Sequence, residues 1–271
     1  RQGSEVLDIL IKMLVIGLDG ATWKVIKDNI NEFPTIKKLM NEGYHKTITV
    51  RGKPLSVPLW CTIFSGKKPE EHGHEEFVVN GKLLHRDDIN LDFIWDILNK
   101  QGYKAFAINI PFVLPPYNFN TQFDAISYGL PETEEEWEKE LWSVTEKAKD
   151  LLQTKPDLLC VVYTLLDRVQ HYYWGSSEVV RWYKKIDDSI KELIQFDNKI
   201  ILLSDHGFCS FGEAKIKTLK KANIDGREVK GDHHEEAILI AKNINYDIKN
   251  PEDIFYAIMN EFNGNKNGTE E

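Results

Sequence analysis

The chain has 271 residues, 42% of them hydrophobic, and a formal net charge of -9 at pH 7. This length and composition suffice for a full hydrophobic core, and no long Pro/Gly/Ser-rich linker divides the sequence, so we expect a single domain over residues 13–262. The acidic balance argues against stable binding to nucleic acid, which requires clustered Lys and Arg to release counterions from phosphates.

The terminal segments, the cysteines and the length of the apolar runs bear on the cellular location of the protein. Residues 1–12 precede Met13, a candidate natural start, so we interpret them as an upstream segment, and we expect residues 263–271 to form a flexible tail. The cysteines form no CxxC pair and no disulfide-dense spacing, which predicts a reducing, cytoplasmic location. Apolar runs are shorter than the roughly 20 residues that span a bilayer, so no membrane segment is expected. The three cysteines are Cys61, Cys160 and Cys209.

Short β-rich runs alternate with helical stretches along the chain. This alternation predicts an α/β fold, with a mostly parallel central sheet and helices on both faces. The expected strands are near-continuous apolar runs, as in strands buried on both faces, and any small cap insertion must come from residues 75–140. The expected strands are residues 13–18, 105–110, 158–164, 199–204 and 237–241. The expected helices are residues 34–41, 58–64, 93–100, 132–152, 179–195 and 251–262.

Ionisable side chains follow three of these strands, at the point where each strand ends. Asp19 follows the first strand, and Asp205 with His206 follows the fourth. Asp167 and His171 follow the third strand and share a face if that stretch is helical. Open parallel sheets bind ligands beyond the carboxyl ends of their strands, so these groups are candidate metal ligands. Taken alone, each is more typical of a turn, a cap or a surface hydrogen bond.

Two further elements complete the set of candidates. His233 and His234 lie just before the last strand, and either of them is placed near the edge of the sheet. Ser56 precedes a helix that begins with Pro58, where unpaired backbone N–H groups favour an alkoxide or a phosphate oxygen. Alone, Ser56 is typical of an ordinary helix cap. Together, three Asp and three His from separate strand ends predict two adjacent metal sites with a serine between them.

The ordered motifs resemble one known family. They are Asp19; Ser56-Val57-Pro58 with Ser65-Gly66 and Pro69-Glu70-Glu71-His72-Gly73; Asp167 with His171; Asp205-His206-Gly207; and Gly231-Asp232-His233. This set resembles the type I phosphodiesterase/nucleotide pyrophosphatase family of the alkaline-phosphatase superfamily, over residues 13–241. The Gly-x-His pattern of that family favours His233 over His234. His72 lies in the Pro-Glu-Glu-His-Gly turn after the nucleophile helix, where we expect a structural role.

The resemblance implies a mechanism and assigns roles. Ser56 would be the nucleophile and a metal contact, attacking phosphorus in line to form a phosphoseryl intermediate that a metal-activated water hydrolyses. The cofactors would be two divalent ions, zinc or alternatively manganese, and the partner a small phosphate ester such as a nucleotide. One ion would be held by Asp19, Asp205 and His206, and the other by Asp167, His171 and His233.

The sequence departs from the family around the nucleophile. Nucleotide pyrophosphatases usually carry Thr-Phe-Pro-Asn, whereas this chain has Ser56-Val57-Pro58-Leu59. Without the Asn, either a backbone N–H or Thr62 would have to donate to the developing oxyanion. A phosphomonoesterase or phosphotransferase of the same superfamily therefore remains an alternative, with Arg168 and Lys53 as candidates for the additional cation.

The sequence argues against three other classes of protein. A sulfatase would need an Arg at the fifth position of the motif that begins at Ser56, and Trp60 is there. An acyl hydrolase with a Ser–His–Asp triad is disfavoured because Ser56 lacks the Gly-x-Ser-x-Gly elbow. A non-catalytic metal-binding or ligand-binding module is the remaining alternative, and the presence of all seven site residues argues against it.

Overall fold

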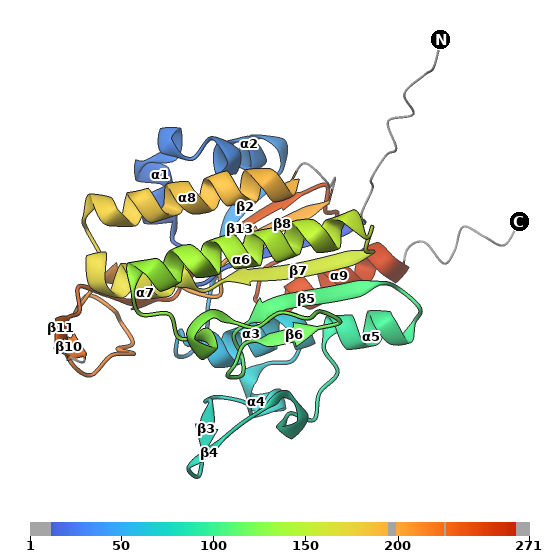
Figure 1. The fold of residues 1–271 in the computed structure, drawn as a ribbon, viewed down its shortest axis with the longest axis horizontal. Coiled ribbons are helices and arrows are strands. Elements are labelled where there is room, and N and C mark those ends of the chain that lie inside the picture. The colour runs from blue at the N-terminus through green and yellow to red at the C-terminus, as the bar shows by residue number, and fades with distance from the viewer. Residues whose placement is uncertain (1–11, 195–198, 225, 264–271) are drawn as a thin grey trace, which may run out of the picture.

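The computed structural model describes residues 12–194, 199–224 and 226–263. Its centre is a seven-stranded sheet with the strand order β2-β13-β8-β1-β7-β5-β6 (Figure 1). The strands are β1 (Met13–Leu18), β2 (Tyr44–Thr49), β5 (Ala105–Ile110), β6 (Tyr117–Phe119), β7 (Leu158–Tyr163), β8 (Ile200–Leu203) and β13 (Glu236–Lys242). All five expected strands are present, which confirms the α/β prediction.

The middle of the sheet is parallel and its margins are antiparallel. Strands β8, β1, β7 and β5 run in the same direction. Strand β13 pairs antiparallel with β8, β2 pairs antiparallel with β13, and β6 pairs antiparallel with β5. Because β13 is reversed, it begins at the edge of the sheet where the four parallel strands end. Strand β2 is reversed again, so its last residues reach that same edge.

Helices cover both faces of the sheet (Figure 1). The helices α1, α2, α6, α7 and α8 lie on one face, and α3, α5 and α9 lie on the other. The helices are α1 (Trp23–Asp28), α2 (Pro34–Glu42), α3 (Ser56–Ser65), α4 (Pro69–His72), α5 (Ile94–Lys100), α6 (Glu134–Gln153), α7 (Leu165–Tyr173), α8 (Ser177–Leu193) and α9 (Asp253–Asn263). The six expected helices match within a few residues, whereas α1 and α4 were not expected.

The alternation of side chains along each strand produces two cores, one on each face. In β1, Leu14 and Ile16 pack under α6 and α8, while Met13 and Val15 pack under α3 and α9. All four side chains are fully buried. Strands buried on both faces need apolar residues at every position, which explains why these runs were recognisable in the sequence.

Residues 75–140, where any cap was expected, contribute small elements and the edge strand β6. A short hairpin of β3 (Val78–Val79) and β4 (Lys82–Leu83) projects from the body of the protein (Figure 1). Three 3₁₀ turns complete the helical elements of the described chain, at Ile30–Glu32, Arg86–Asp88 and Ile126–Gly129. The remaining short strands are β9 (Gly207–Ser210), β10 (Asn223–Ile224), β11 (Arg227–Glu228) and β12 (Gly231–His234).

The expected upstream segment and flexible tail lie outside the described residues, apart from Lys12 and Asn263. Among the helices of the described ranges, none is both long enough and apolar enough to cross a bilayer.

Candidate active site

The candidate residues meet at the edge of the sheet where the parallel strands end. Asp19 leaves β1, while Asp205 and His206 lie between β8 and β9. Strand β7 leads directly into α7, which carries Asp167 in its first turn and His171 one turn later. Because β8, β1 and β7 are parallel neighbours, their carboxyl ends place all of these groups side by side.

The remaining two residues reach this edge from other elements. Strand β12, which directly precedes β13, pairs with β9 and places His233 opposite Phe208. Ser56 is the first residue of α3, and the loop before it follows the end of β2. Because β13 begins and β2 ends at this edge, residues from two distant parts of the chain meet the ends of the parallel strands.

The first group of candidate ligands consists of Asp19, Asp205 and His206. One ligand atom from each lies within 4.8 Å of the others. His206 Nε2 is 3.5 Å from Asp19 Oδ1 and 3.4 Å from Asp205 Oδ2. The Ser56 hydroxyl donates to Asp19 Oδ1 at 3.1 Å, and its oxygen lies 3.3 Å from His206 Nε2. The serine thus contacts two members of this group.

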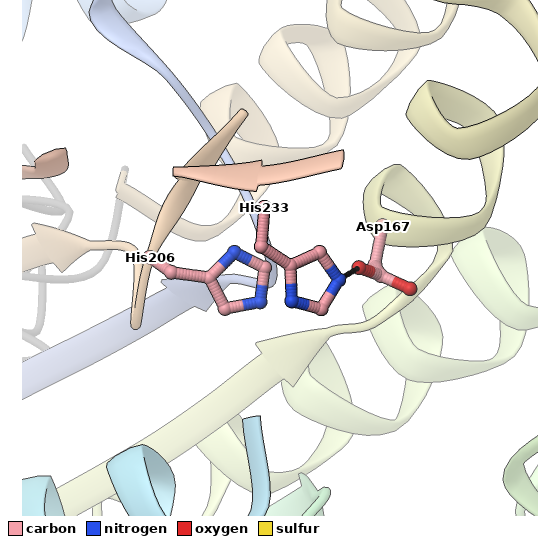
Figure 2. A group of neighbouring side chains, drawn as sticks. All are labelled: Asp167, His206 and His233. Atoms are coloured by element: carbon pink, nitrogen blue, oxygen red, sulfur yellow. Dashed lines mark ion pairs between the residues drawn. The ribbon is translucent and has the colours of Figure 1, made fainter. Parts of the chain in front are cut away.

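The second group consists of Asp167, His171 and His233, with His206 close by. Asp167 Oδ1 lies 3.0 Å from His233 Nε2 and 3.4 Å from His171 Nε2, and the two imidazole Nε2 atoms are 3.1 Å apart. Figure 2 shows the rings of His206 and His233 side by side, with the Asp167 carboxylate at the edge of His233. Their ring centroids are 3.9 Å apart, so the two groups adjoin one another.

Backbone carbonyl groups fix the tautomer of all three histidines. Each ring has its Nδ1 atom within hydrogen-bond distance of a carbonyl oxygen, which can only accept, so Nδ1 carries the proton. In each neutral ring, Nε2 then presents a lone pair to the cluster, as metal-ligating histidines do. The acceptors are Gly231 for His171 at 3.0 Å, Gly207 for His206 at 3.0 Å and Pro54 for His233 at 2.6 Å.

The carboxylates of the cluster are buried and only partly satisfied. Asp205 Oδ1 accepts from Gly20 N at 3.1 Å, but Asp205 Oδ2 has no hydrogen-bond partner. Asp167 Oδ1 is close to two imidazoles yet is not in hydrogen-bond geometry with either. Each of the two groups therefore contains one buried carboxylate oxygen that lacks a hydrogen-bond donor. Buried carboxylates of this kind are normally paired or coordinate metal ions, so the donor set fits two cations.

The protonation of the cluster reflects the same crowding of acids. Burial raises the pKa of Asp205 to about 7. Burial, followed by repulsion from Asp205 and Asp167, holds the pKa of Asp19 well above its usual value. Burial also holds the pKa of His206 far below its usual value, so this ring is neutral. A bound divalent cation would oppose the repulsion between these carboxylates.

The nucleophile helix differs from the expectation in two respects. It begins at Ser56, two residues before the expected start at Pro58. Thr62 lies about 9 Å further along this helix, from the rise of 1.5 Å per residue, and its Oγ1 is 3.0 Å from His72 Nε2. Thr62 is thus poorly placed as an oxyanion donor beside Ser56, whereas the free backbone N–H groups in the first turn of α3 point toward that end of the helix.

The other histidines that were considered lie outside the cluster. His72 accepts from His74 N at 3.0 Å, and His74 Nε2 contacts the carbonyl oxygen of Phe112. Both therefore serve the turn after α3. His234 Nδ1 accepts from Glu236 N at 3.3 Å, because neighbouring residues of β12 point to opposite sides. The structure therefore brings His233, and not His234, to the candidate site.

Two supporting residues were missed at the sequence level. Gln170 is fully buried, and its amide donates to the carbonyl of Gly20 at 2.9 Å. The amide oxygen of Gln170 accepts from the hydroxyl of Tyr183, which in turn accepts from Thr22 N. This chain of bonds holds α7 against the turn after β1. A buried Gln between two candidate ligands of one helix was the available signal for it.

Solved structures with the same fold span nearly the whole chain. Phosphonoacetate hydrolase from Sinorhizobium meliloti 1021, in complex with phosphonoformate, is 13% identical, with a TM-score of 0.65 over 93% of this chain and 96% of that one. Human ectonucleotide pyrophosphatase/phosphodiesterase 5 is 15% identical, with a TM-score of 0.64 over 93% and 95%. The inactive murine counterpart, in complex with AMP, is 15% identical, with a TM-score of 0.66 over 93% and 95%. These structures show an alkaline-phosphatase-like fold.

The sequence comparisons point to one family. No curated protein sequence gives a significant match. A family profile, described as type I phosphodiesterase/nucleotide pyrophosphatase, matches residues 13–220, which is most of the chain. The chain therefore belongs to the type I phosphodiesterase/nucleotide pyrophosphatase family, whose members are phosphoric ester hydrolases.

Proposed function

We propose that this protein hydrolyses phosphate diesters or phosphoanhydrides by nucleophilic attack of Ser56, with two divalent metal ions at the site. The position of Ser56 Oγ carries this proposal, because the oxygen lies 3.1 Å from Asp19 Oδ1 and 3.3 Å from His206 Nε2. It therefore sits at the margin of a buried Asp/His cluster and at the first turn of a helix. A serine in these surroundings is placed to be activated by a metal ion.

The proposed ligands form two sets that share a border. His171 completes the second set, since its Nε2 lies beside both Asp167 and His233. Two bound cations would supply charge stabilisation at the attacking and leaving oxygens and would generate the hydrolytic nucleophile from water. The first set is Asp19, Asp205 and His206, with Ser56 as a further contact. The second set is Asp167, His171 and His233, and His206 also lies within reach of Asp167 and His233.

Residues of the protein orient the nucleophile and stabilise the phosphoryl oxygens in the proposed reaction. Asp19 accepts the hydrogen bond of the Ser56 hydroxyl and so orients its oxygen. In the proposed reaction, Ser56 Oγ forms a bond to phosphorus while the ester bond breaks and the alcohol leaves with a proton. Water then hydrolyses the phosphoserine, which releases phosphate monoester and restores the hydroxyl. The N–H groups at the start of α3 are proposed to stabilise the phosphoryl oxygens during both steps.

We propose zinc as the metal. Three imidazoles, each with Nδ1 on a backbone carbonyl, and three carboxylates form the donor set, and zinc accepts nitrogen and oxygen ligands of this type. Manganese is the alternative, because it shares the carboxylate ligands. Titration of metal-stripped protein with each metal, followed by isothermal calorimetry, would rank the two.

A phosphomonoesterase or phosphotransferase activity is the second candidate. Of the two cations considered for it, Arg168 lies 3.6 Å from Glu132 Oε1, whereas Lys53 makes no ion pair within the described residues. Lys53 precedes Ser56 by three residues and is the better placed of the two for an additional phosphate oxygen. A monoester with two negative charges would benefit from such a cation.

One experiment separates these candidates. Metal-stripped protein is assayed on bis-p-nitrophenyl phosphate and on p-nitrophenyl phosphate, with and without added zinc or manganese. We expect a preference for the diester that appears only with metal. A preference for the monoester would favour the second candidate, and activity that survives chelation would contradict the proposed use of metal ions.

Location and partners are also proposed. The three cysteines are buried and free of disulfides, which supports a reducing compartment such as the cytoplasm. A small phosphate ester is proposed as the substrate, and stable binding of nucleic acid is not expected of a chain with a net charge of -9. Cell fractionation with an antibody against the protein would test the first of these statements.

A further inference from the structure

A buried acid, Glu140, faces the point where strand β7 passes into helix α7. Glu140 belongs to α6, which lies beside α7 (Figure 1), and it is 3% exposed. Its Oε1 atom accepts from the backbone N–H of Thr164 at 2.7 Å and from the Thr164 hydroxyl at 2.8 Å. Thr164 immediately precedes the first residue of α7. Glu140 therefore caps the start of α7 from a neighbouring helix.

The start of α7 is satisfied by this acid and not by its own capping residue. The Thr164 side chain makes no capping hydrogen bond to the helix, and its hydroxyl donates to Glu140. Burial raises the pKa of Glu140, while hydrogen bonds from the backbone N–H groups of Thr164 and Leu165 act in the opposite direction. The first N–H groups of a helix have no partner within the helix and carry partial positive charge, so an acceptor at this position stabilises the helix start.

Asn109 holds the same carboxylate from strand β5. Its Nδ2 atom donates to Glu140 Oε1 at 3.3 Å and to the carbonyl of Val162 at 3.0 Å. The backbone pairing of β5 with β7 ends one residue earlier, at Ile108 and Val161. Asn109 has a φ of 58°, in the left-handed region that Asn tolerates better than most residues. Its side chain thus continues the connection between the two strands and ties Glu140 to the end of β7.

Helix α7 carries two of the three ligands proposed for the second metal ion. Asp167 lies in its first turn and His171 one turn later on the same face. The backbone N–H of Asp167 donates to the carbonyl of Thr164 at 3.2 Å, so Thr164 joins Glu140 to the ligand-bearing turn. Asp167 Oδ1 lies 3.4 Å from His171 Nε2 and 3.0 Å from His233 Nε2. A shift of the helix start would move Asp167 and His171 away from His233, which belongs to β12.

We propose that Glu140 is a positioning residue for the second ligand set: it fixes the start of α7 and thereby holds Asp167 and His171 against His233. The inference rests on the proposed function, since it concerns the same two metal ions. Replacing residues that orient metal ligands typically lowers metal affinity by about 10–100-fold. Glu140 acts through the backbone and does not touch a ligand side chain, so we expect an effect at the lower end of this range.

The helical layer contains a matched control. Asp187 in α8 caps the start of α2 in the same way, because it accepts from the backbone N–H groups of Thr35 and Ile36 at 3.0 and 2.7 Å. Helix α2 carries none of the proposed ligands. Glu140→Ala and Asp187→Ala therefore truncate equivalent caps, of which only one belongs to a ligand helix. Two milder changes complete the set: Thr164→Val removes only a hydroxyl, and Glu140→Gln keeps an oxygen that can accept.

Calorimetric titration of each metal-stripped variant with zinc measures its affinity for metal, and urea denaturation in chelator measures its stability. We expect Glu140→Ala to bind one of the two zinc ions about tenfold more weakly than the wild type. Thr164→Val should show a smaller loss, and Glu140→Gln should stay close to the wild type. Asp187→Ala should lose stability without losing affinity for zinc. If Glu140→Ala does not fold, Thr164→Val carries the same test.

A double variant assigns the loss to the second ligand set. In Asp167→Asn this set is already impaired, so the addition of Glu140→Ala or Thr164→Val should cause no further loss of zinc affinity. An equal further loss in that background would overturn the positioning role. The same conclusion would follow if folded Glu140→Ala and Thr164→Val bound zinc as tightly as Asp187→Ala does. A wild type that binds fewer than two zinc ions would instead contradict the proposed function itself, and the positioning role with it.

Discussion

Two regions of the molecule bury carboxylate oxygens but treat them differently. In the helical layer, Asp187 is fully buried and accepts from the backbone N–H groups of Thr35 and Ile36 at 3.0 and 2.7 Å, at the start of α2. Glu140 in α6 accepts from Thr164 N and from Thr164 Oγ1 at 2.7 and 2.8 Å. Donors from the chain itself therefore satisfy both of these carboxylates.

At the strand ends, the chain leaves buried carboxylate oxygens without donors. Asp205 Oδ2 and Asp167 Oδ1 have no hydrogen-bond partner, although Asp205 is fully buried. The three neighbouring imidazoles direct lone pairs, rather than protons, toward these oxygens. Since buried charges are normally paired, the difference teaches that the helical layer is complete by itself, whereas the strand-end cluster has the composition of a cation-binding site.

The largest expected effect is the loss of turnover in Ser56→Ala, a variant that separates catalysis from metal binding. Ser56→Ala removes the proposed nucleophile but none of the Asp or His ligands, so we expect turnover to fall by about three orders of magnitude or more with the metal content retained. Metal analysis beside single-turnover kinetics would measure both quantities. An equal loss of metal and of activity would show that Ser56 holds the site together instead of reacting.

The next largest effect concerns Asp205, whose Oδ2 atom has no hydrogen-bond partner. Asp205→Asn keeps the shape of the side chain but removes a buried charge, so we expect zinc affinity to fall by at least about tenfold. Without metal, the same variant should be more stable than the wild type, because a neutral amide is less costly to bury. Calorimetric titration with zinc and urea denaturation in chelator would test the two expectations, and an Asn variant that is less stable without metal would contradict them.

The matched change in the helical layer should have the opposite effect on stability. Asp187→Asn replaces one of two oxygens that accept backbone N–H groups, so we expect the free energy of unfolding to fall by about 1–3 kcal/mol. Zinc content should not change, because Asp187 is remote from the cluster in the fold. Urea denaturation with and without chelator measures this effect. If both Asn variants shifted stability in the same direction, the distinction between the two regions would fail.

The smallest effect is a dependence of stability on pH. The pKa of Asp205 is about 7 in the folded chain, and about 3.9 when unfolded. Between these values Asp205 is protonated in the folded state and ionised in the unfolded state, so its contribution to the stability of the metal-free protein should decrease as pH rises. His206 contributes in the opposite direction, because its pKa is lowered by burial, so the quantity to measure is the difference between the wild type and Asp205→Asn. With zinc present the trend should reverse, because metal binding requires deprotonated ligands. Thermal melts of both proteins from pH 4.5 to 7.5 would reveal this difference, and a metal-free wild type that gains stability relative to Asp205→Asn as pH rises would refute this account.

Much of the fold was predictable because its central strands are buried on both faces. Strand β1 and strand β5 have the predicted bounds, since an uninterrupted apolar run leaves little ambiguity. Strand β2 was not predicted because it lies at the edge of the sheet, with a mixture of buried and exposed residues along Tyr44–Thr49. The reversal of β13 could not be predicted either, because the direction of a strand depends on connections that no local pattern encodes.

The candidate site was predictable where the chemistry is concentrated in short motifs. Asp205-His206-Gly207 directly follows an apolar strand, so its position at the sheet edge followed from the fold. Of the two oxyanion donors considered, a backbone N–H is favoured over Thr62, because Thr62 lies six residues along α3 from Ser56 and contacts His72. The roles of Gln170 and Tyr183 depend on contacts between α7, α8 and the turn at Gly20, which only the packed structure contains.

The central claim is that the strand-end cluster holds two divalent ions, and its most direct test is metal analysis. The wild type, Asp205→Asn and Asp167→Asn would each be equilibrated with limiting free zinc, and the bound metal would be counted per chain. The account predicts two ions in the wild type and about one in each variant, with Asp187→Asn unchanged from the wild type. A wild type that retains no zinc, or variants that retain as much as the wild type, would contradict it.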